Sequence, residues 1–198
     1  KVVKFVRSGN FAWLEMTALY WLAGSNRNLR QHSVSKLTFQ RAIAVAEKIG
    51  DRYGLQRNLL DLALDGSFLG QHKVALDGLY RALEVSNAGY SPIRQRFRLS
   101  VGASDVFLAA GQFAAARNAA EDAITLSKSE KDRTFAVISG NKAGAAYLKS
   151  GDPEAASRYF DSALAEAALF TDEASRKRMT ALSYLQMAGL ARSRGDVA

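Results

Sequence analysis

The chain has 198 residues, of which 48% are hydrophobic and 23% are charged, values that are ordinary for a soluble folded protein. It contains no cysteine, which excludes disulfides, thiol catalysis and cysteine-ligated zinc sites. The formal net charge of +8 would attract nucleic acid, anionic lipid or acidic protein segments. The basic residues are scattered, and the clusters around Arg96 and Lys177 lack the interleaved aromatic residues of a base-stacking platform, so nucleic-acid binding is not expected. No apolar run reaches the roughly 18–20 residues that a membrane span needs.

Four similar windows follow one another along the chain, and the first residues of these windows are Arg30, Gly70, Gly111 and Gly151. Each window has a small residue five positions after its first residue, an apolar residue four positions later, and an alanine three positions after that. These residues are Ser35, Phe39 and Ala42; Ala75, Leu79 and Ala82; Ala116, Ala120 and Ala123; Ala156, Phe160 and Ala163. The alanines recur at spacings of 40, 41 and 40 residues. A period of about 20–50 residues indicates a solenoid, in which each repeat buries its apolar face only against its neighbours.

The fourth repeat predicts how one such unit is built. Ala143, Gly144 and Tyr147 form one stripe of a first helix, which runs into Gly151, a residue that tolerates the left-handed conformation at a helix end. Asp152 is expected to cap a second helix that has Pro153 at its first position. Small residues on the second helix would let the two helices approach closely, with Phe160 filling the space between them. The repeat is therefore predicted to be a helix–turn–helix hairpin.

These features resemble the tetratricopeptide repeat (TPR) family. The matching residues are Leu62, Ala63, Gly70, Ala75, Leu79 and Ala82 in the second repeat, Ala103, Phe107, Gly111, Ala116 and Ala123 in the third, and Ala143, Gly144, Tyr147, Gly151, Ala156, Phe160 and Ala163 in the fourth. The first repeat matches more weakly, through Leu22, Ala23, Phe39 and Ala42, with Arg30 where a glycine is expected. A fifth begins with Tyr184, Met187, Ala188, Ala191 and Gly195.

The resemblance implies an all-α fold, a right-handed α-α superhelix formed by one repeat array over residues 1–198, with about four full repeats and partial repeats at the ends. The period of 40 or 41 residues departs from the usual value of about 34 in the family and adds nearly two helical turns to each repeat. It resembles the long-helix versions of bacterial signalling proteins. The alternative is a plain helical bundle with accidental self-similarity, but four in-phase repeats with coincident turns favour the solenoid.

Catalytic and metal-binding patterns are not found in the sequence. The two histidines, His32 and His72, occupy the same repeat position and have no ligand partner at helical spacing, so a shared turn preference explains them better than a metal site. The carboxylates do not converge, and no nucleophile elbow or phosphate-binding glycine loop occurs. We therefore expect a non-enzymatic chain without cofactor or metal.

The resemblance also implies which positions of each first helix face a concave groove. Carried onto this sequence, the candidate partner-binding residues are Tyr20, Arg57, Leu60, Leu64, Phe68, Arg98, Asp105, Leu108, Asn141 and Lys149. Their mixture of apolar and basic side chains would suit an amphipathic or acidic peptide or helix. Phe68 is the strongest single candidate, because a large aromatic side chain near a turn is costly to expose. The alternative is that several of these residues pack between repeats or face solvent without a binding role. A second groove asparagine is missing, which argues against capture of chaperone C-termini.

These observations predict a scaffold or regulatory module that binds a protein or peptide. The chain is expected to be a fragment of a longer, bacterial signalling protein. The alternative is a sensor whose groove takes a small ligand or signal peptide and controls an attached output domain. Self-association through the terminal repeats is a third option. A cytoplasmic location is expected, with the periplasm as the alternative.

Overall fold

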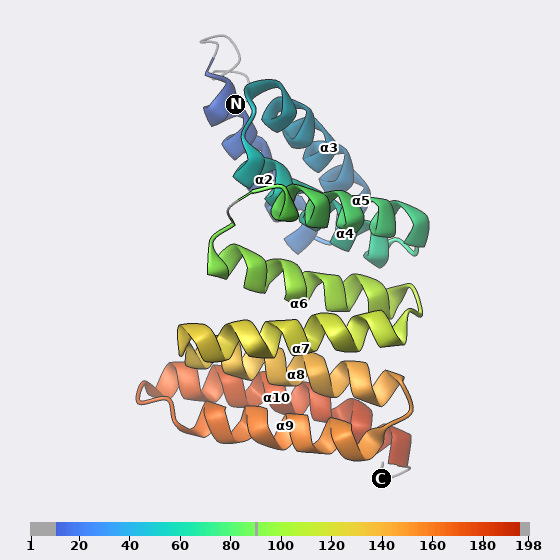
Figure 1. Ribbon diagram of the computed structural model, residues 1–198, viewed down its shortest axis with the longest axis vertical. Coiled ribbons are helices and arrows are strands. Elements are labelled where there is room, and N and C mark those ends of the chain that lie inside the picture. The colour runs from blue at the N-terminus through green and yellow to red at the C-terminus, as the bar shows by residue number, and fades with distance from the viewer. Residues whose placement is uncertain (1–10, 90, 195–198) are drawn as a thin grey trace. The chain divides into compact units, whose positions relative to one another are not determined.

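The computed structural model describes residues 11–89 and 91–194, and every regular element within these ranges is a helix (Figure 1). The all-α class predicted from the sequence is therefore confirmed for the described residues. The chain divides into two compact units, which comprise residues 1–95 and residues 96–198.

Unit 1 contains two helical hairpins. Its helices are α2 (Ala12–Asn28), α3 (His32–Ile49), α4 (Arg52–Phe68) and α5 (His72–Asn87). Helix α2 packs against α3, and α4 packs against α5. Helix α4 also contacts both helices of the preceding hairpin, so each hairpin supplies part of the interior of the next.

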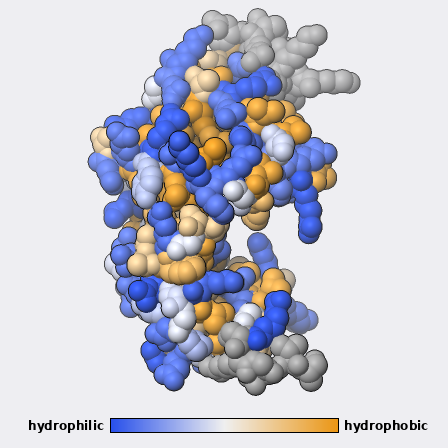
Figure 2. Space-filling model, turned by 90° about the vertical axis from the view of Figure 1, so that its right-hand side faces the viewer, coloured by the Kyte–Doolittle hydropathy of each residue, from blue (hydrophilic) through white to orange (hydrophobic). Residues whose placement is uncertain are grey.

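Unit 2 continues the same arrangement. Its helices are α6 (Ile93–Ala109), which begins at the end of unit 1, α7 (Phe113–Glu130), α8 (Arg133–Lys149), α9 (Pro153–Ala168) and α10 (Glu173–Arg194). Helix α8 packs between α7 and α9, and α10 contacts α8 and α9. On the face that Figure 2 shows, hydrophobic residues reach the surface in patches between hydrophilic ones.

The turn after each first helix has one recurring backbone conformation. A positive φ, between 58° and 83°, occurs at Arg30, Gly70, Gly111 and Gly151. The next residue in each turn donates its amide N–H to a carbonyl oxygen five residues earlier, as in the 2.8 Å bond from Gln71 to Gly66. This bond closes the C-terminus of the first helix. The sequence windows thus begin at structurally equivalent turns.

The helix caps of the fourth repeat are those predicted from the sequence. The Asp152 side chain accepts a hydrogen bond from the amide of Ala155 at 2.9 Å, and Pro153 occupies the first turn of α9. Asp51 caps α4 and Asp132 caps α8 in the same way. These carboxylates satisfy amide groups that have no partner inside the helix.

The recurring small residues form the interior of the hairpins, as predicted. The four framing alanines are fully buried: Ala42, Ala82, Ala123 and Ala163. Phe160 is fully buried as well, and a Cβ placed on Gly144 would lie 2.5 Å from its ring. The two helices of the fourth hairpin therefore approach each other too closely for any side chain at position 144.

The expected fifth repeat corresponds to α10, which carries Tyr184, Met187, Ala188 and Ala191. Its expected turn at Gly195 lies outside the described residues.

Candidate functional site

A groove in unit 2 is lined by three first helices, α6, α8 and α10. It has a volume of about 400 Å³, and its lining residues are Leu108, Ala109, Ala145, Leu148, Lys149, Leu185, Gln186, Gly189 and Arg192. The lining is mostly apolar, with two cationic side chains, Lys149 and Arg192, both of them exposed. Gly189 leaves room in the groove, because the one atom of the described residues within 4 Å of a Cβ built there is Cδ2 of Leu148, at 3.6 Å.

Polar contacts between the same helices fix their spacing next to the groove. Asn141 of α8 donates its side-chain amide to Oγ of Ser183 on α10 at 2.9 Å. Lys142 of α8 binds both carboxylate oxygens of Asp105 on α6, at 2.6 and 2.8 Å. The groove therefore lies on a scaffold whose helices are tied together, which lowers the entropy lost when a ligand binds.

Unit 1 has a buried polar cluster at the corresponding first helices, α2 and α4. The Arg27 guanidinium donates Nε–H to Oδ1 of Asp65 at 2.9 Å and Nη1–H to Oδ1 of Asp61 at 2.8 Å, and it also donates to the Asp61 carbonyl oxygen. Asp65 is completely buried and receives a further hydrogen bond from the Ser35 hydroxyl. His32 Nδ1 lies 3.2 Å from the same carboxylate.

Opposing influences act on the pKa of Arg27. Burial by itself would lower the pKa of the guanidinium, but the hydrogen bond to Asp65 and the charge of Asp61 outweigh burial and raise it. Arg27 is therefore permanently charged, and the cluster is an ion-pair network that holds α2 against α4.

Aromatic side chains surround this network. The Arg57 guanidinium lies 3.7 Å from the ring centroid of Tyr20, which is a close cation–π contact. Phe68 stacks on His32 with ring centroids 4.8 Å apart, yet 66% of Phe68 remains exposed. An aromatic side chain this exposed at the end of a first helix is available to a ligand.

The structure distributes the ten residues predicted for the groove among different environments. Leu108 and Lys149 both line the unit 2 groove. Leu60 and Asn141 are buried, so they contribute to the interior and offer no free surface to a partner. Leu64, Tyr20 and Arg57 are half-buried, and Asp105 is paired with Lys142. Arg98 is half-buried and engaged in an interaction.

Sequence reasoning missed the contribution of α10 to the groove. Leu185, Gln186 and Arg192 line it, but groove positions were assigned only in the first four repeats. Leu185 occupies the same repeat position as Tyr20 and Leu60, and Arg192 occupies the same position as Leu108. Extending the assignment to the fifth repeat would therefore have selected both residues.

His32 contacts Asp65 and Phe68 in this structure. Within residues 11–89 and 91–194, no three histidine, aspartate or glutamate side chains come together in a way that could hold a metal ion.

No protein-family model matches the sequence, and no curated protein matches it either. Among solved structures, the fold is similar to the crystal structure of the apo form of RapI, with a TM-score of 0.70 and 11% sequence identity. The similar region covers 98% of this chain and 54% of RapI, so the chain spans about half the length of that protein. The comparison confirms a TPR-like fold of repeated helical hairpins.

None of the described helices combines the length and the apolar character that crossing a membrane requires.

Proposed function

We propose that this chain is a non-catalytic module that regulates other proteins by binding a protein segment or peptide in the unit 2 groove. The observation that carries the proposal is the groove itself, which lies where three successive first helices meet and is lined by apolar side chains with two cations among them. A TPR-like fold supports this proposal, since stacked hairpins provide contact surface on their first helices.

The lining defines the chemistry of the expected ligand. Leu108, Leu148 and Leu185 would contact apolar side chains, whereas Lys149 and Arg192 would attract a carboxylate. An extended peptide or a short helix with one or two large apolar residues next to an acidic residue or a free C-terminus meets both requirements. The apolar contacts would supply most of the affinity, and the exposed charges would mainly select the ligand.

Three variants test this proposal with a pool of synthetic peptides that differ in apolar and acidic content. Gly189→Leu places a side chain in the groove without disturbing the helix backbone, and we expect it to abolish peptide retention. Replacing Lys149 and Arg192 by glutamate should remove acidic peptides from the bound fraction. Arg158→Glu makes the same kind of charge change at an exposed position of α9 outside the groove and serves as the control. Equal retention by Gly189→Leu and the unmodified chain would refute the groove as the binding site.

A second candidate function is a sensor for a small ligand. It is favoured by the volume of about 400 Å³, which lies within the range of about 300–1,000 Å³ that small-molecule pockets occupy. A thermal-shift screen separates the two functions. A metabolite that raises the melting temperature of the unmodified chain, but not of Gly189→Leu, favours the sensor over peptide binding.

A further inference from the structure

The first hairpin of unit 1 exposes a large apolar surface, which we call the end face. It comprises Leu14, Ala18, Trp21 and Leu22 on α2, Leu29 directly after it, and Val34 and Leu37 on α3. Trp21 is 67% exposed and Leu29 is 68% exposed, although large apolar residues are normally covered. Leu14, Ala18, Trp21 or Leu22, and Leu29 follow one another at intervals of three, four or seven residues, so they share one side of the helix.

The equivalent stripe on α4, the first helix of the second hairpin, is covered by other helices. Forty residues later along α4, the residues corresponding to Leu14, Ala18, Trp21 and Leu22 are Gly54, Asn58, Asp61 and Leu62, and all four are buried. The preceding hairpin covers them, since Met16 contacts Asn58 and Arg27 binds Asp61. The end face therefore occupies the position in the repeat at which helices pack onto α4.

The chemistry of the end face differs from that of its counterpart on α4. Where α4 has Asp61 and Asp65 to receive Arg27, α2 has Trp21 and Ser25. A helix that covers α2 therefore meets apolar side chains and no carboxylate. Its contacting residues must be apolar as well, because an arginine brought to this position would lose its hydration without gaining an ion-pair partner.

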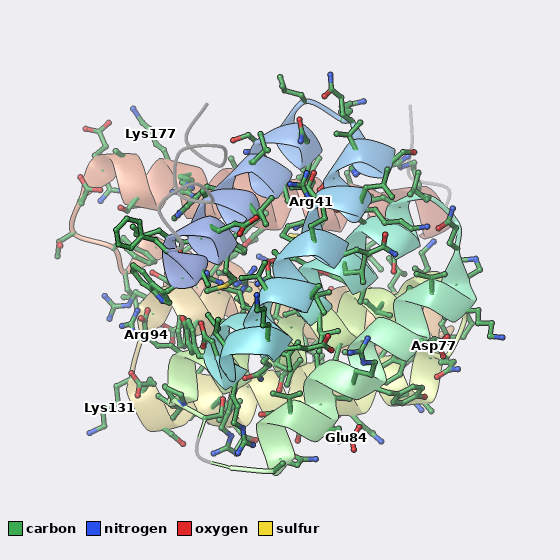
Figure 3. The ribbon with its side chains drawn as sticks, turned by 90° about the horizontal axis from the view of Figure 1, so that it is seen from above. Arg41, Asp77, Glu84, Arg94, Lys131 and Lys177 are labelled. Atoms are coloured by element: carbon green, nitrogen blue, oxygen red, sulfur yellow. The ribbon has the colours of Figure 1, made fainter. Side chains whose placement is uncertain are left out.

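Two cations border the end face on α3. Val34, Leu37, Arg41 and Lys48 follow one another at intervals of three, four and seven residues and so share one flank of the helix. The opposite flank of α3 faces the following hairpin, where Lys36 binds Gln71 and Glu47 binds Arg81. Figure 3 looks onto the α2–α3 hairpin and places Arg41 on the viewer's side of α3.

Arg41 and Lys48 are both exposed, and neither forms an ion pair with another residue in the described part of the chain. Glu15, the one acidic residue of α2, is already engaged in an interaction. The border of the end face therefore offers positive charge that a negatively charged partner can neutralise.

We infer that the end face binds an amphipathic helix of a partner protein, one with an apolar stripe against Trp21 and Leu22 and acidic residues along the edge that lies over Arg41 and Lys48. A second copy of this chain is a poor occupant, because it would bring another Arg41 and Lys48. The exposed apolar residues of α10, Tyr184 and Leu185, lie on a helix that carries Arg176, Lys177 and Arg178, so this surface also has the wrong charge. The inference is independent of the groove in unit 2.

Tryptophan fluorescence reports directly on this surface. The chain has two tryptophans, Trp13 and Trp21, and both lie on α2. In a Trp13→Phe background, the emission comes from Trp21 alone and shifts to shorter wavelength when that side chain leaves water. The probes are two helical peptides of about 18 residues, matched to the 17 residues of α2, with the same leucine stripe and either glutamate or lysine along both edges.

We expect the glutamate peptide to give a saturable blue shift and to bind at least about tenfold more tightly than the lysine peptide. Arg41→Glu combined with Lys48→Glu should reverse this preference, and Leu22→Glu should abolish binding of both peptides. Circular dichroism checks that these exposed substitutions leave the helix content unchanged. Gly189→Leu, which blocks the other groove, should bind the glutamate peptide as the parent does.

Four results would overturn the inference. Equal binding of both peptides would show that Arg41 and Lys48 do not select the partner. Loss of binding in Gly189→Leu would show that the peptide binds in the unit 2 groove. A concentration-dependent dimer in analytical ultracentrifugation, with blue-shifted emission in the absence of peptide, would make a second copy the occupant. A shift caused by vesicles of phosphatidylcholine and phosphatidylglycerol, but by neither peptide, would make it a lipid surface.

Discussion

Arg27 on α2 and Asp65 on α4 are 38 residues apart in sequence, yet Nε of the arginine lies 2.9 Å from Oδ1 of the aspartate. The aspartate is completely buried, and its second oxygen accepts from Ser35. This pair ties the first hairpin of unit 1 to the second.

The first prediction concerns that pair. Asp65→Ala removes one of the two carboxylates that bind Arg27 and leaves only Asp61, so we expect a loss of about 1.5–3 kcal/mol in the free energy of unfolding, measured by urea denaturation. Glu47→Ala is the matched control, because Glu47 and Arg81 form an exposed ion pair at 2.6 Å that should contribute at most about 1 kcal/mol. A similar loss in both variants would contradict the structural role assigned to Asp65.

The second prediction compares two helical glycines. A Cβ at Gly144 would lie 2.5–2.8 Å from three ring atoms of the fully buried Phe160, so Gly144→Ala should cost about 1–3 kcal/mol by overpacking. A Cβ at Gly189 would meet Leu148 at an ordinary 3.6 Å, so Gly189→Ala should gain up to about 1 kcal/mol from helix propensity. Thermal unfolding of the two variants should therefore shift the midpoint in opposite directions.

The third prediction concerns the turn that departs from the glycine pattern. Arg30 has a φ of 58°, a conformation that costs an L-residue about 1–2 kcal/mol. Arg30→Gly should therefore stabilise unit 1 by about 1 kcal/mol, since part of the relief is offset by the greater freedom of glycine in the unfolded chain. The reverse change, Gly70→Arg, should destabilise, although no atom lies within 4 Å of a Cβ at that position. An unchanged melting temperature in both variants would show that the turn conformation carries no strain.

The fourth prediction concerns Phe68. Because this side chain is 66% exposed, Phe68→Ala should change the free energy of unfolding by less than about 1 kcal/mol. Loss of the stacked ring should shift the imidazole proton resonances of His32 in NMR spectra. Phe68 does not line the unit 2 groove, so the same variant should retain as many peptides from the synthetic pool as the unmodified chain does. If Phe68→Ala unfolds the protein, the assignment of this residue to a binding surface is wrong.

The fifth prediction concerns alkaline pH. The hydrogen bond from the Tyr147 phenol to the Glu121 carboxylate, with burial as the second cause, raises the pKa of Tyr147 above its ordinary value of 10.0. The folded state therefore holds this proton more tightly than the unfolded state. Its contribution to stability is complete below pH 10 and is lost as the pH rises through the raised pKa. In Tyr147→Phe, the free energy of unfolding should fall less at alkaline pH than in the unmodified chain. Titration followed by phenolate absorbance should show one fewer tyrosine with a raised pKa.

The repeat pattern predicted the interior of the hairpins well and the functional surfaces less well. Ala163 and Phe160 are buried as expected because their neighbours are local, within one hairpin. Leu60 and Asn141 were assigned to the groove from their repeat positions but are buried, and Asn141 binds Ser183 of α10, a contact that a repeat position alone does not reveal. The contribution of α10 to the groove was missed because groove positions were assigned only in the first four repeats.

The sequence by itself determined the helical hairpin, its turns and caps, and the small residues that let its two helices meet, because these depend on contacts between residues close together in the chain. Only the tertiary structure decided that Arg27 pairs with Asp61 and Asp65, that three first helices enclose a groove beside Lys149 and Arg192, and that the stripe containing Trp21 has no helix of the described chain packed on it. These features depend on how one hairpin lies against the next, and that packing joins side chains far apart in the sequence, such as Arg27 and Asp61, which are 34 residues apart.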